Sequence, residues 1–199
     1  MTNNWLTPIT LEGQKVKLIP LDHSHKEALL KAANDGELSE LWYTFVPSIA
    51  TIDNYLDVAF EDQKKGNALP FVVVDKASGQ IIGTTRYCNA TPEHRRLEIG
   101  YTWYAKSYQR TGVNTECKFL LLQHAFENLD AIAVEFRTHW HNHQSRNAIL
   151  RLGAKQDGVL RSHRIDSDGA LRDTVVFSII EVEWKTVKKS LQFKMKAIH

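Results

Sequence analysis

The sequence has little of what marks several large classes of protein. It contains only two cysteines, Cys88 and Cys117, and they form no Cys-x-x-Cys pair. Neither a disulfide scaffold nor a cysteine zinc site is indicated, and a reducing cytoplasm is the expected compartment. No apolar run approaches the roughly 20 residues that span a bilayer, and residues 1–8 lack the basic segment and apolar core of a secretory signal. We therefore expect a cytoplasmic protein without a membrane anchor.

A strong charge of one sign is also missing. The chain has 25 Lys and Arg against 23 Asp and Glu, a net charge of +2, which gives no reason to expect nucleic acid or an anionic membrane as a partner. It has no Gly-Lys-Ser/Thr phosphate loop and no Gly-x-Gly-x-x-Gly, so nucleoside-triphosphate and dinucleotide folds lose support. His139, His141 and His143 alternate without an acidic neighbour, and we expect no metal there.

What is present indicates one globular domain. Apolar residues make up 43% and charged residues 24% of 199 residues, enough for a core and a solvated surface. No repeat or flexible linker divides the chain, so we expect a single domain over residues 1–184.

The tail over residues 185–199 has five lysines and no acidic residue. Its apolar residues recur near helical spacing, at Val187, Leu191, Met195 and Ile198. This pattern predicts an amphipathic helix that packs on the domain. A polyanion-binding arm is the alternative.

Hydrophobic periodicity predicts an alternation of strands and helices. Strands are expected over 14–21, 69–74, 81–87, 96–104, 131–138, 158–165 and 173–182. Helices are expected from Asp22 or Ser24 to near Gly36, and over 51–65, 115–128 and 145–152. This order predicts an α+β (mixed α/β) fold, with a twisted, mostly antiparallel sheet of seven strands and helices on both faces. Gly100, inside a predicted strand, indicates a bulge or a close backbone approach.

One joint between a strand and a helix predicts an anion site. The predicted strand ending at Tyr104 leads through residues 109–114 into a long helix. The free N–H groups and positive dipole end of such a helix bind anions, and Gly112 lets the backbone approach a phosphate closely.

Several separated segments, in the right order, resemble the GNAT acetyltransferases, and within them the RimJ/RimL-type enzymes that modify protein N-termini. They are Glu98–Tyr101, Gln109–Asn114, Asn142–Ser145, Arg151–Ala154 and the closing stretch 157–184. The resemblance covers roughly residues 12–184. It implies the GNAT fold, whose sheet splays between two central strands where acetyl-CoA enters. It also implies a homodimer, since dimers are frequent in this branch.

The resemblance further implies a set of residues that bind coenzyme A. The backbone amides of Gln109, Arg110, Thr111, Gly112, Val113, Asn114 and Thr115 correspond to the family's diphosphate loop, although Asn114 stands where Gly or Ala is usual. The strand residues Thr102, Trp103 and Tyr104 correspond to those that pair with the pantetheine arm. Asn142 corresponds to a coenzyme ligand and Ser145 to a residue near the thioester sulfur. As an alternative, Asn142 and Ser145 together form a helix cap.

We expect direct acetyl transfer in a ternary complex, without an acyl-enzyme. Glu98 is the candidate general base; the alternative is a structural ion pair with Arg95, Arg96 or another cation. Many GNAT enzymes carry a tyrosine as general acid seven residues after the asparagine, and here that position is Ile149. Ser145 is therefore the candidate that meets the departing thiolate, and backbone amides of residues 102–104 would polarise the thioester carbonyl.

The acceptor is expected to be a primary amine. An α-amine with a pKa of about 7.7–8.0 is roughly one-tenth neutral at neutral pH, whereas a lysine near 10.4 is almost fully charged, which favours a protein or peptide N-terminus. The alternatives are a small amine (an antibiotic, a polyamine or an amino acid), another acyl-CoA donor, and a catalytically silent acyl-CoA-binding module. Trp42, Tyr43 and Phe45 are candidates for the acceptor wall, with core packing as the other interpretation.

Overall fold

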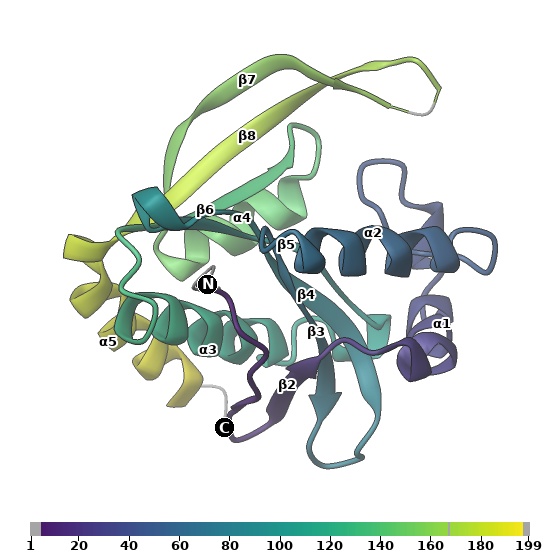
Figure 1. The fold of residues 1–199 in the computed structure, drawn as a ribbon, viewed down its shortest axis with the longest axis horizontal. Coiled ribbons are helices and arrows are strands. Elements are labelled where there is room, and N and C mark those ends of the chain that lie inside the picture. The colour runs from purple at the N-terminus through teal and green to yellow at the C-terminus, as the bar shows by residue number, and fades with distance from the viewer. Residues whose placement is uncertain (1–4, 167, 197–199) are drawn as a thin grey trace.

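Eight strands form one twisted sheet in the computed structural model, which describes residues 5–166 and 168–196 (Figure 1). The strands are β1 (Leu11–Glu12), β2 (Val16–Pro20), β3 (Leu69–Asp75), β4 (Ile81–Thr91), β5 (Arg96–Tyr104), β6 (Ala133–His139), β7 (Lys155–Ile165) and β8 (Leu171–Ile180). Their order is β1-β2-β3-β4-β5-β6-β8-β7, and every neighbouring pair is antiparallel except β5 and β6. The mixed, mostly antiparallel sheet is confirmed, but the count of seven strands is wrong. The additional strand, β1, has two residues, too few for a detectable alternation.

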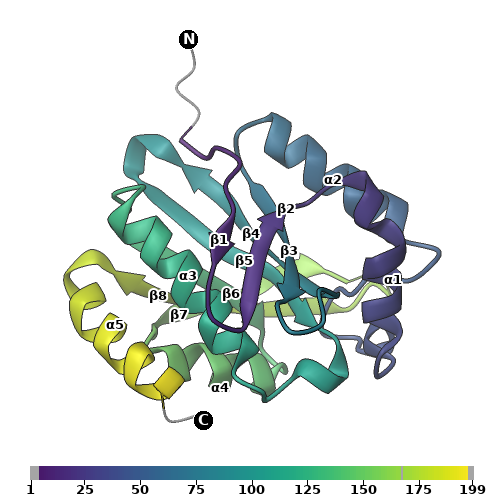
Figure 2. The ribbon, with the colours of Figure 1, turned by 90° about the horizontal axis from the view of Figure 1, so that it is seen from below.

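Five α-helices cover both faces of the sheet, as expected (Figure 2). They are α1 (Lys26–Asn34), α2 (Ile52–Lys64), α3 (Val113–Glu127), α4 (His143–Leu152) and α5 (Glu181–Lys196). None of these helices is long and apolar enough to cross a membrane.

Two hydrophobic cores lie on opposite faces of the sheet, and β3 contributes to both. Phe71 and Val73 are fully buried in the core that includes α3, α4 and α5. Val72, between them, is fully buried in the core formed with α1 and α2. Successive side chains of a strand point to opposite faces, so a strand covered on both sides is a continuous apolar run.

The sheet opens between its two central strands. The parallel pair β5 and β6 is in register at only three positions, Arg96 with Ala133, Leu97 with Val134 and Glu98 with Glu135. Beyond Glu98, β5 is paired with β4 alone. The two strands therefore diverge toward their carboxyl ends, which is the splay that the family resemblance implied.

The last helix begins earlier than expected. The sequence placed the closing strand over 173–182 and the tail from residue 185, whereas β8 ends at Ile180 and α5 starts at Glu181. Helix α5 packs on α3, where Trp184 stacks on Phe126 with ring centroids 5.2 Å apart. Ile198 of the predicted apolar stripe lies outside the described residues.

Candidate active site

The turn that opens α3 presents backbone N–H donors that have no partner among the described residues. Gly112 is the N-cap with φ 92°, Arg110 also has a positive φ of 63°, and no side chain caps the helix. The first amide of α3 with an acceptor inside the helix is that of Glu116. Its N–H donates to the Gly112 carbonyl at 3.1 Å, an ordinary length for such a bond. The helix starts at Val113, two residues before the predicted Thr115. Its first N–H groups are therefore free to bind an anion.

A cavity of about 790 Å³ runs from this turn through the opening of the sheet. That volume falls within the range of about 300–1,000 Å³ typical of ligand sites. Most of the sequence-predicted site residues line it: Glu98, Thr102, Trp103, Tyr104, Gln109, Arg110, Gly112, Asn114, Thr115, Asn142 and Ser145. Two do not. Val113 is buried in the core, and the hydroxyl of Thr111 is turned back to the Tyr108 carbonyl at 2.6 Å.

Helix α4 contributes Asn142 and Ser145 to the cavity. Asn142 is the N-cap of α4, and its Oδ1 accepts the backbone N–H of Ser145 at 2.9 Å. The capping interpretation is thus correct for the amide oxygen. It leaves the Asn142 amide nitrogen and the Ser145 hydroxyl without hydrogen-bond partners in the described part of the chain. Ile149, where relatives have a tyrosine, is buried and lines the same cavity.

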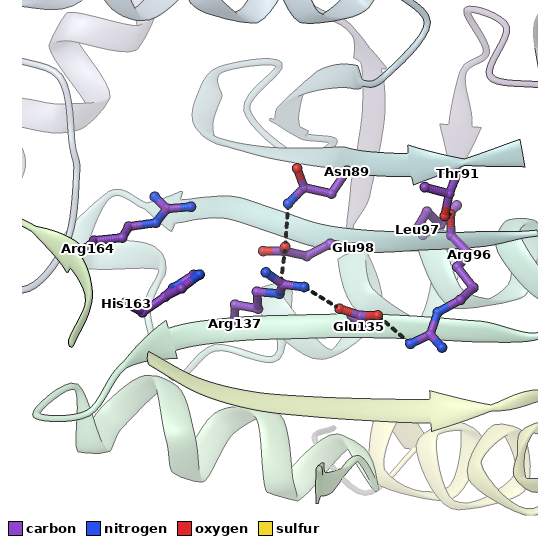
Figure 3. A pocket seen from close by; sticks show the side chains of 9 residues that line it. All are labelled: Asn89, Thr91, Arg96, Leu97, Glu98, Glu135, Arg137, His163 and Arg164. Carbon is purple, nitrogen blue, oxygen red and sulfur yellow. Dashed lines mark hydrogen bonds and ion pairs between the residues drawn. The ribbon is translucent and has the colours of Figure 1, made fainter. Parts of the chain in front are cut away.

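Glu98 lies at the other end of the cavity, between Asn89 and Arg137 (Figure 3). Its Oε2 accepts from Asn89 Nδ2 at 2.8 Å and lies 3.5 Å from Arg137 Nε. The side chain is only 10% exposed. Burial raises the pKa of Glu98, although the Asn89 hydrogen bond and then the Arg137 charge oppose that rise. A carboxyl group held in this way suits a general base that works near neutral pH.

The alternative interpretation of Glu98, an ion pair with Arg95, Arg96 or another cation, is correct only for another cation. Arg95 pairs with Asp130, and Arg96 pairs with Glu135. The partner that Glu98 has is Arg137, on the neighbouring strand β6. A second cavity of about 410 Å³ adjoins this group and shares Asn89, Glu98, Arg137 and Arg164 with the first.

A bulge in β5 separates Glu98 from the α3 end of the cavity. Thr84 of β4 opposes Trp103, but Arg86 opposes Gly100, so β5 carries one extra residue here, and Tyr101 has φ 50°. The fully buried guanidinium of Arg86 lies 4.1 Å from the Tyr101 ring centroid. A Cβ at Gly100 would lie 3.1 Å from both Glu98 Oε1 and Cys88 Sγ, so any larger residue here would press on the Glu98 carboxylate. Both features that Gly100 indicated in the sequence therefore occur together.

A buried lysine that was not predicted from the sequence also lines the large cavity. Lys118 of α3 is 5% exposed and lines the cavity, and its Nζ donates to the hydroxyls of Thr102 and Thr85. Burial lowers the pKa of Lys118 to about 7. Its spacing from Thr115 and Leu122, on the inward face of the helix, was the signal that could have revealed it.

Glu116 has a structural role that the sequence did not indicate. Its carboxylate accepts the backbone N–H groups of Gln14, Lys15 and Val16, at 2.7, 2.9 and 3.1 Å. These bonds tie the first turns of α3 to the start of β2.

The candidate acceptor wall is partly as expected. Tyr43 and Phe45 line the large cavity, but Trp42 does not. Trp42 is 66% exposed and packs against His139, with ring centroids 5.0 Å apart. Within the described ranges, no cluster of three or more His, Cys, Asp or Glu is arranged to hold a metal ion.

Comparison with known proteins agrees with this geometry. Residues 15–155 match the family model described as "Acetyltransferase (GNAT) domain". The chain is 26% identical over 175 residues to a Bacillus subtilis protein named "Putative ribosomal N-acetyltransferase YdaF", covering 87% of this chain and 94% of the other. A GCN5-related N-acetyltransferase of Brucella melitensis has a similar structure, with a TM-score of 0.86 and 31% identity over 96% of this chain and 86% of that one. The structure titled "Mycobacterium smegmatis RimJ in complex with CoA-disulfide" shares the fold, with a TM-score of 0.80 and 22% identity over 98% and 97% of the two chains.

Proposed function

Since the chain belongs to the GNAT family of acetyltransferases and is therefore an acyltransferase, we propose that it moves an acetyl group from acetyl-CoA to the α-amine at a protein or peptide N-terminus. The observation that carries this proposal is the single cavity that joins the open turn at α3 to the buried carboxyl group of Glu98. The names of two relatives, a ribosomal N-acetyltransferase and RimJ, support an N-terminal amine as the acceptor.

The residues at the α3 turn suit the diphosphate of acetyl-CoA. Backbone donors there have no partner, the dipole of a 15-residue helix adds positive potential, and Arg110 and Arg151 line the same end of the cavity. Gly112 leaves room for a phosphate to approach the backbone. When bound, acetyl-CoA supplies an acetyl group activated as a thioester. The unpaired edge of β5 beyond Glu98 can accept hydrogen bonds from, and donate them to, an extended amide-containing arm.

Glu98 acts on the acceptor. Only a neutral amine is nucleophilic, and Glu98 takes the proton that the amine must lose. Asn89 and Arg137 fix the carboxylate, and its raised pKa brings it closer to that of an α-amine. The backbone amides of residues 102–104 polarise the thioester carbonyl. Attack is direct, so no acyl-enzyme forms.

Ser145 stabilises the coenzyme A thiolate as it leaves. Its hydroxyl is at the start of α4, where the dipole also favours a negative charge. Ile149 cannot donate a proton, so Ser145 or a water that it orients takes this role.

The experiment is release of free thiol from acetyl-CoA in the presence of separate amines. We expect turnover with short peptides that have a free N-terminus, and none with the same peptides after N-terminal acetylation, even where they contain lysine. Turnover confined to free lysine, polyamines or antibiotics contradicts the proposed acceptor. Calorimetric binding of acetyl-CoA without turnover of any amine instead indicates a silent acyl-CoA-binding module.

A further inference from the structure

Two arginines face each other on the β7–β8 hairpin. Arg164 of β7 is directly opposite Arg172 of β8 in the antiparallel register. Like charges at opposed positions destabilise a sheet. Burial, and after it the charge of Arg164, lowers the pKa of Arg172. The folded chain therefore contains an electrostatic repulsion at this point.

The described residues do not neutralise this pair. Arg172 Nε is buried without a hydrogen-bond acceptor, and no described carboxylate lies within 4.0 Å of either guanidinium. A buried guanidinium nitrogen without an acceptor loses its hydration and gains nothing in return. An anion that bound between the two arginines would relieve both costs.

The carboxylates of the surrounding elements have other partners. Three of them are in ion pairs: Glu98 with Arg137, Glu135 with Arg96 and Arg137, and Asp173 with Arg161. The fourth, Asp166, lies 3.7 Å from Nε2 of His139, whose pKa is lowered by burial, so this contact adds little charge pairing at neutral pH. Of these four, only Asp166 raises the pKa of Arg172, and it does so less than Arg164 lowers it. His163, next to Arg164, has a pKa lowered first by burial and then by the charges of Arg164, Arg137 and Arg172. The local potential is therefore positive.

The arginine pair lies in the same cavity as the candidate base. Arg164 and Arg172 both line the large cavity, and Arg164 also lines the smaller one with Glu98 (Figure 3). Arg164 is close enough for its charge to lower the pKa of Glu98. The diphosphate turn, by contrast, is at the α3 end, with its own arginines. An anion at the pair would thus belong to the acceptor.

We propose that Arg164 and Arg172 bind a carboxylate of the acceptor, so that the preferred substrate carries an acidic group close to the amine that Glu98 deprotonates. This inference rests on the proposed function. Planar guanidinium groups match the two oxygens of a carboxylate, which gives orientation as well as affinity. The carboxylate is the side chain of an acidic residue shortly after the N-terminus, or the α-carboxylate of a free amino acid.

The test uses matched acceptors that differ in one charge. Short peptides with a free α-amine and an amidated C-terminus carry glutamate or glutamine at the second, third or fourth position, and free glutamate is compared with isoglutamine, its α-amide, which lacks only the α-carboxylate. With wild-type protein we expect kcat/KM to be about tenfold or more higher for the acidic member of the preferred pair, since hydrogen bonds to charged groups discriminate by this order. The pair that shows the preference identifies the source of the carboxylate.

The variants are Arg164→Gln and Arg172→Gln, with Arg161→Gln as the control. Arg161 is on the same hairpin, pairs with Asp173 and is not among the residues lining either cavity. We expect the acidic preference to fall below about threefold in the two test variants and to persist in Arg161→Gln, with the KM for acetyl-CoA unchanged in all three. Arg172→Lys provides a variant that keeps the charge if Arg172→Gln does not fold.

The outcomes separate this inference from the proposed function. Equal kcat/KM for glutamate and glutamine peptides, with both acetylated, overturns the carboxylate site and leaves N-terminal acetylation standing. A strong preference for free glutamate with no peptide turned over supports the site and contradicts the proposed acceptor. If no amine is turned over, calorimetry of the same peptides against the coenzyme A complex decides: equal affinities overturn the inference, and tighter binding of the acidic peptide supports it.

Discussion

The two ends of the large cavity are built in different ways. Besides Arg110 and Arg151, the α3 end consists of backbone donors, a glycine and small polar groups that are close together in the sequence, at residues 110–115 and 142–145. The Glu98 end consists of charged side chains brought together from β5, β6, β7 and β8. An anion of fixed shape can be held by main chain alone, whereas proton transfer requires a group whose pKa the surroundings have shifted. Substitutions at the two ends should therefore have different kinetic signatures.

Glu98→Gln is expected to have the largest effect. Loss of a general base should lower kcat by about 100-fold or more, with little change in the KM for acetyl-CoA. In the wild type, kcat/KM should rise with pH through a pKa above the usual 4.5 of a glutamate, because burial raises the pKa of Glu98. That limb should be absent from the pH profile of the variant.

Glu135→Gln is the matched control for Glu98→Gln. Glu135 is in register with Glu98 and also pairs with Arg137, but it does not line the large cavity. A similar loss of kcat in both variants would mean that Glu98 acts only by holding Arg137.

Lys118→Met is expected to stabilise the protein. The pKa of Lys118 is about 7 in the folded chain and near 10.5 when unfolded, so the unfolded chain binds more protons between these values. Wild-type stability should therefore rise with pH across this window, and the advantage of the variant, on the order of 1–3 kcal/mol near neutral pH, should shrink toward pH 10. Urea unfolding of the wild type and the variant at several pH values measures the difference in their free energies of unfolding. If that difference did not change with pH, the pKa of Lys118 would not be lowered in the folded chain.

Gly112→Val tests the main-chain end. A β-branched residue resists the φ of 92° found at Gly112, so the turn should distort and the KM for acetyl-CoA should rise about tenfold, with a smaller change in kcat. Gly79→Val is the control, because Gly79 has φ 71° and open space around it in a distant hairpin. Gly79→Val should lose about as much stability as Gly112→Val, but its KM for acetyl-CoA should stay that of the wild type. A raised KM for acetyl-CoA in both variants would indicate a general effect of strain.

Ser145→Ala should have the smallest effect. A thiol has a pKa of about 8.5, so its anion leaves readily, and we expect kcat to fall only about fivefold while the affinity for coenzyme A is retained. Unchanged kcat in single-turnover measurements would remove Ser145 from the mechanism.

The same contrast between the two ends explains what could be predicted from the sequence. Periodicity located the long strands and helices, and the α3 turn and the Asn142 cap followed from residues that are neighbours in the chain. Strand β1 was missed because two residues carry no period. The end of β8 was misplaced because Val182 continues the apolar pattern into α5.

At the charged end Glu98 was predicted, but the charged groups around it were not, since they are distant from it in the sequence. Which cation reaches Glu98 depends on the parallel register of β5 and β6, which puts Arg137 beside it rather than Arg95 or Arg96. The opposition of Arg164 and Arg172 depends in turn on a register shift between Leu160 and Arg164 in the β7–β8 pair. Neither register is encoded in a local pattern.

The hydrogen bonds of Glu116 link the turn that opens α3 to the first strands at the edge of the sheet. The backbone N–H groups of Gln14, Lys15 and Val16 all donate to the Glu116 carboxylate, only four residues beyond Gly112. Ordering of the turn by a bound diphosphate should therefore slow deuterium uptake at these amides, which lie in the β1–β2 turn and at the start of β2 and line neither cavity. The first strands of the chain thus act as a built-in reporter of donor occupancy, readable without any label at the site itself.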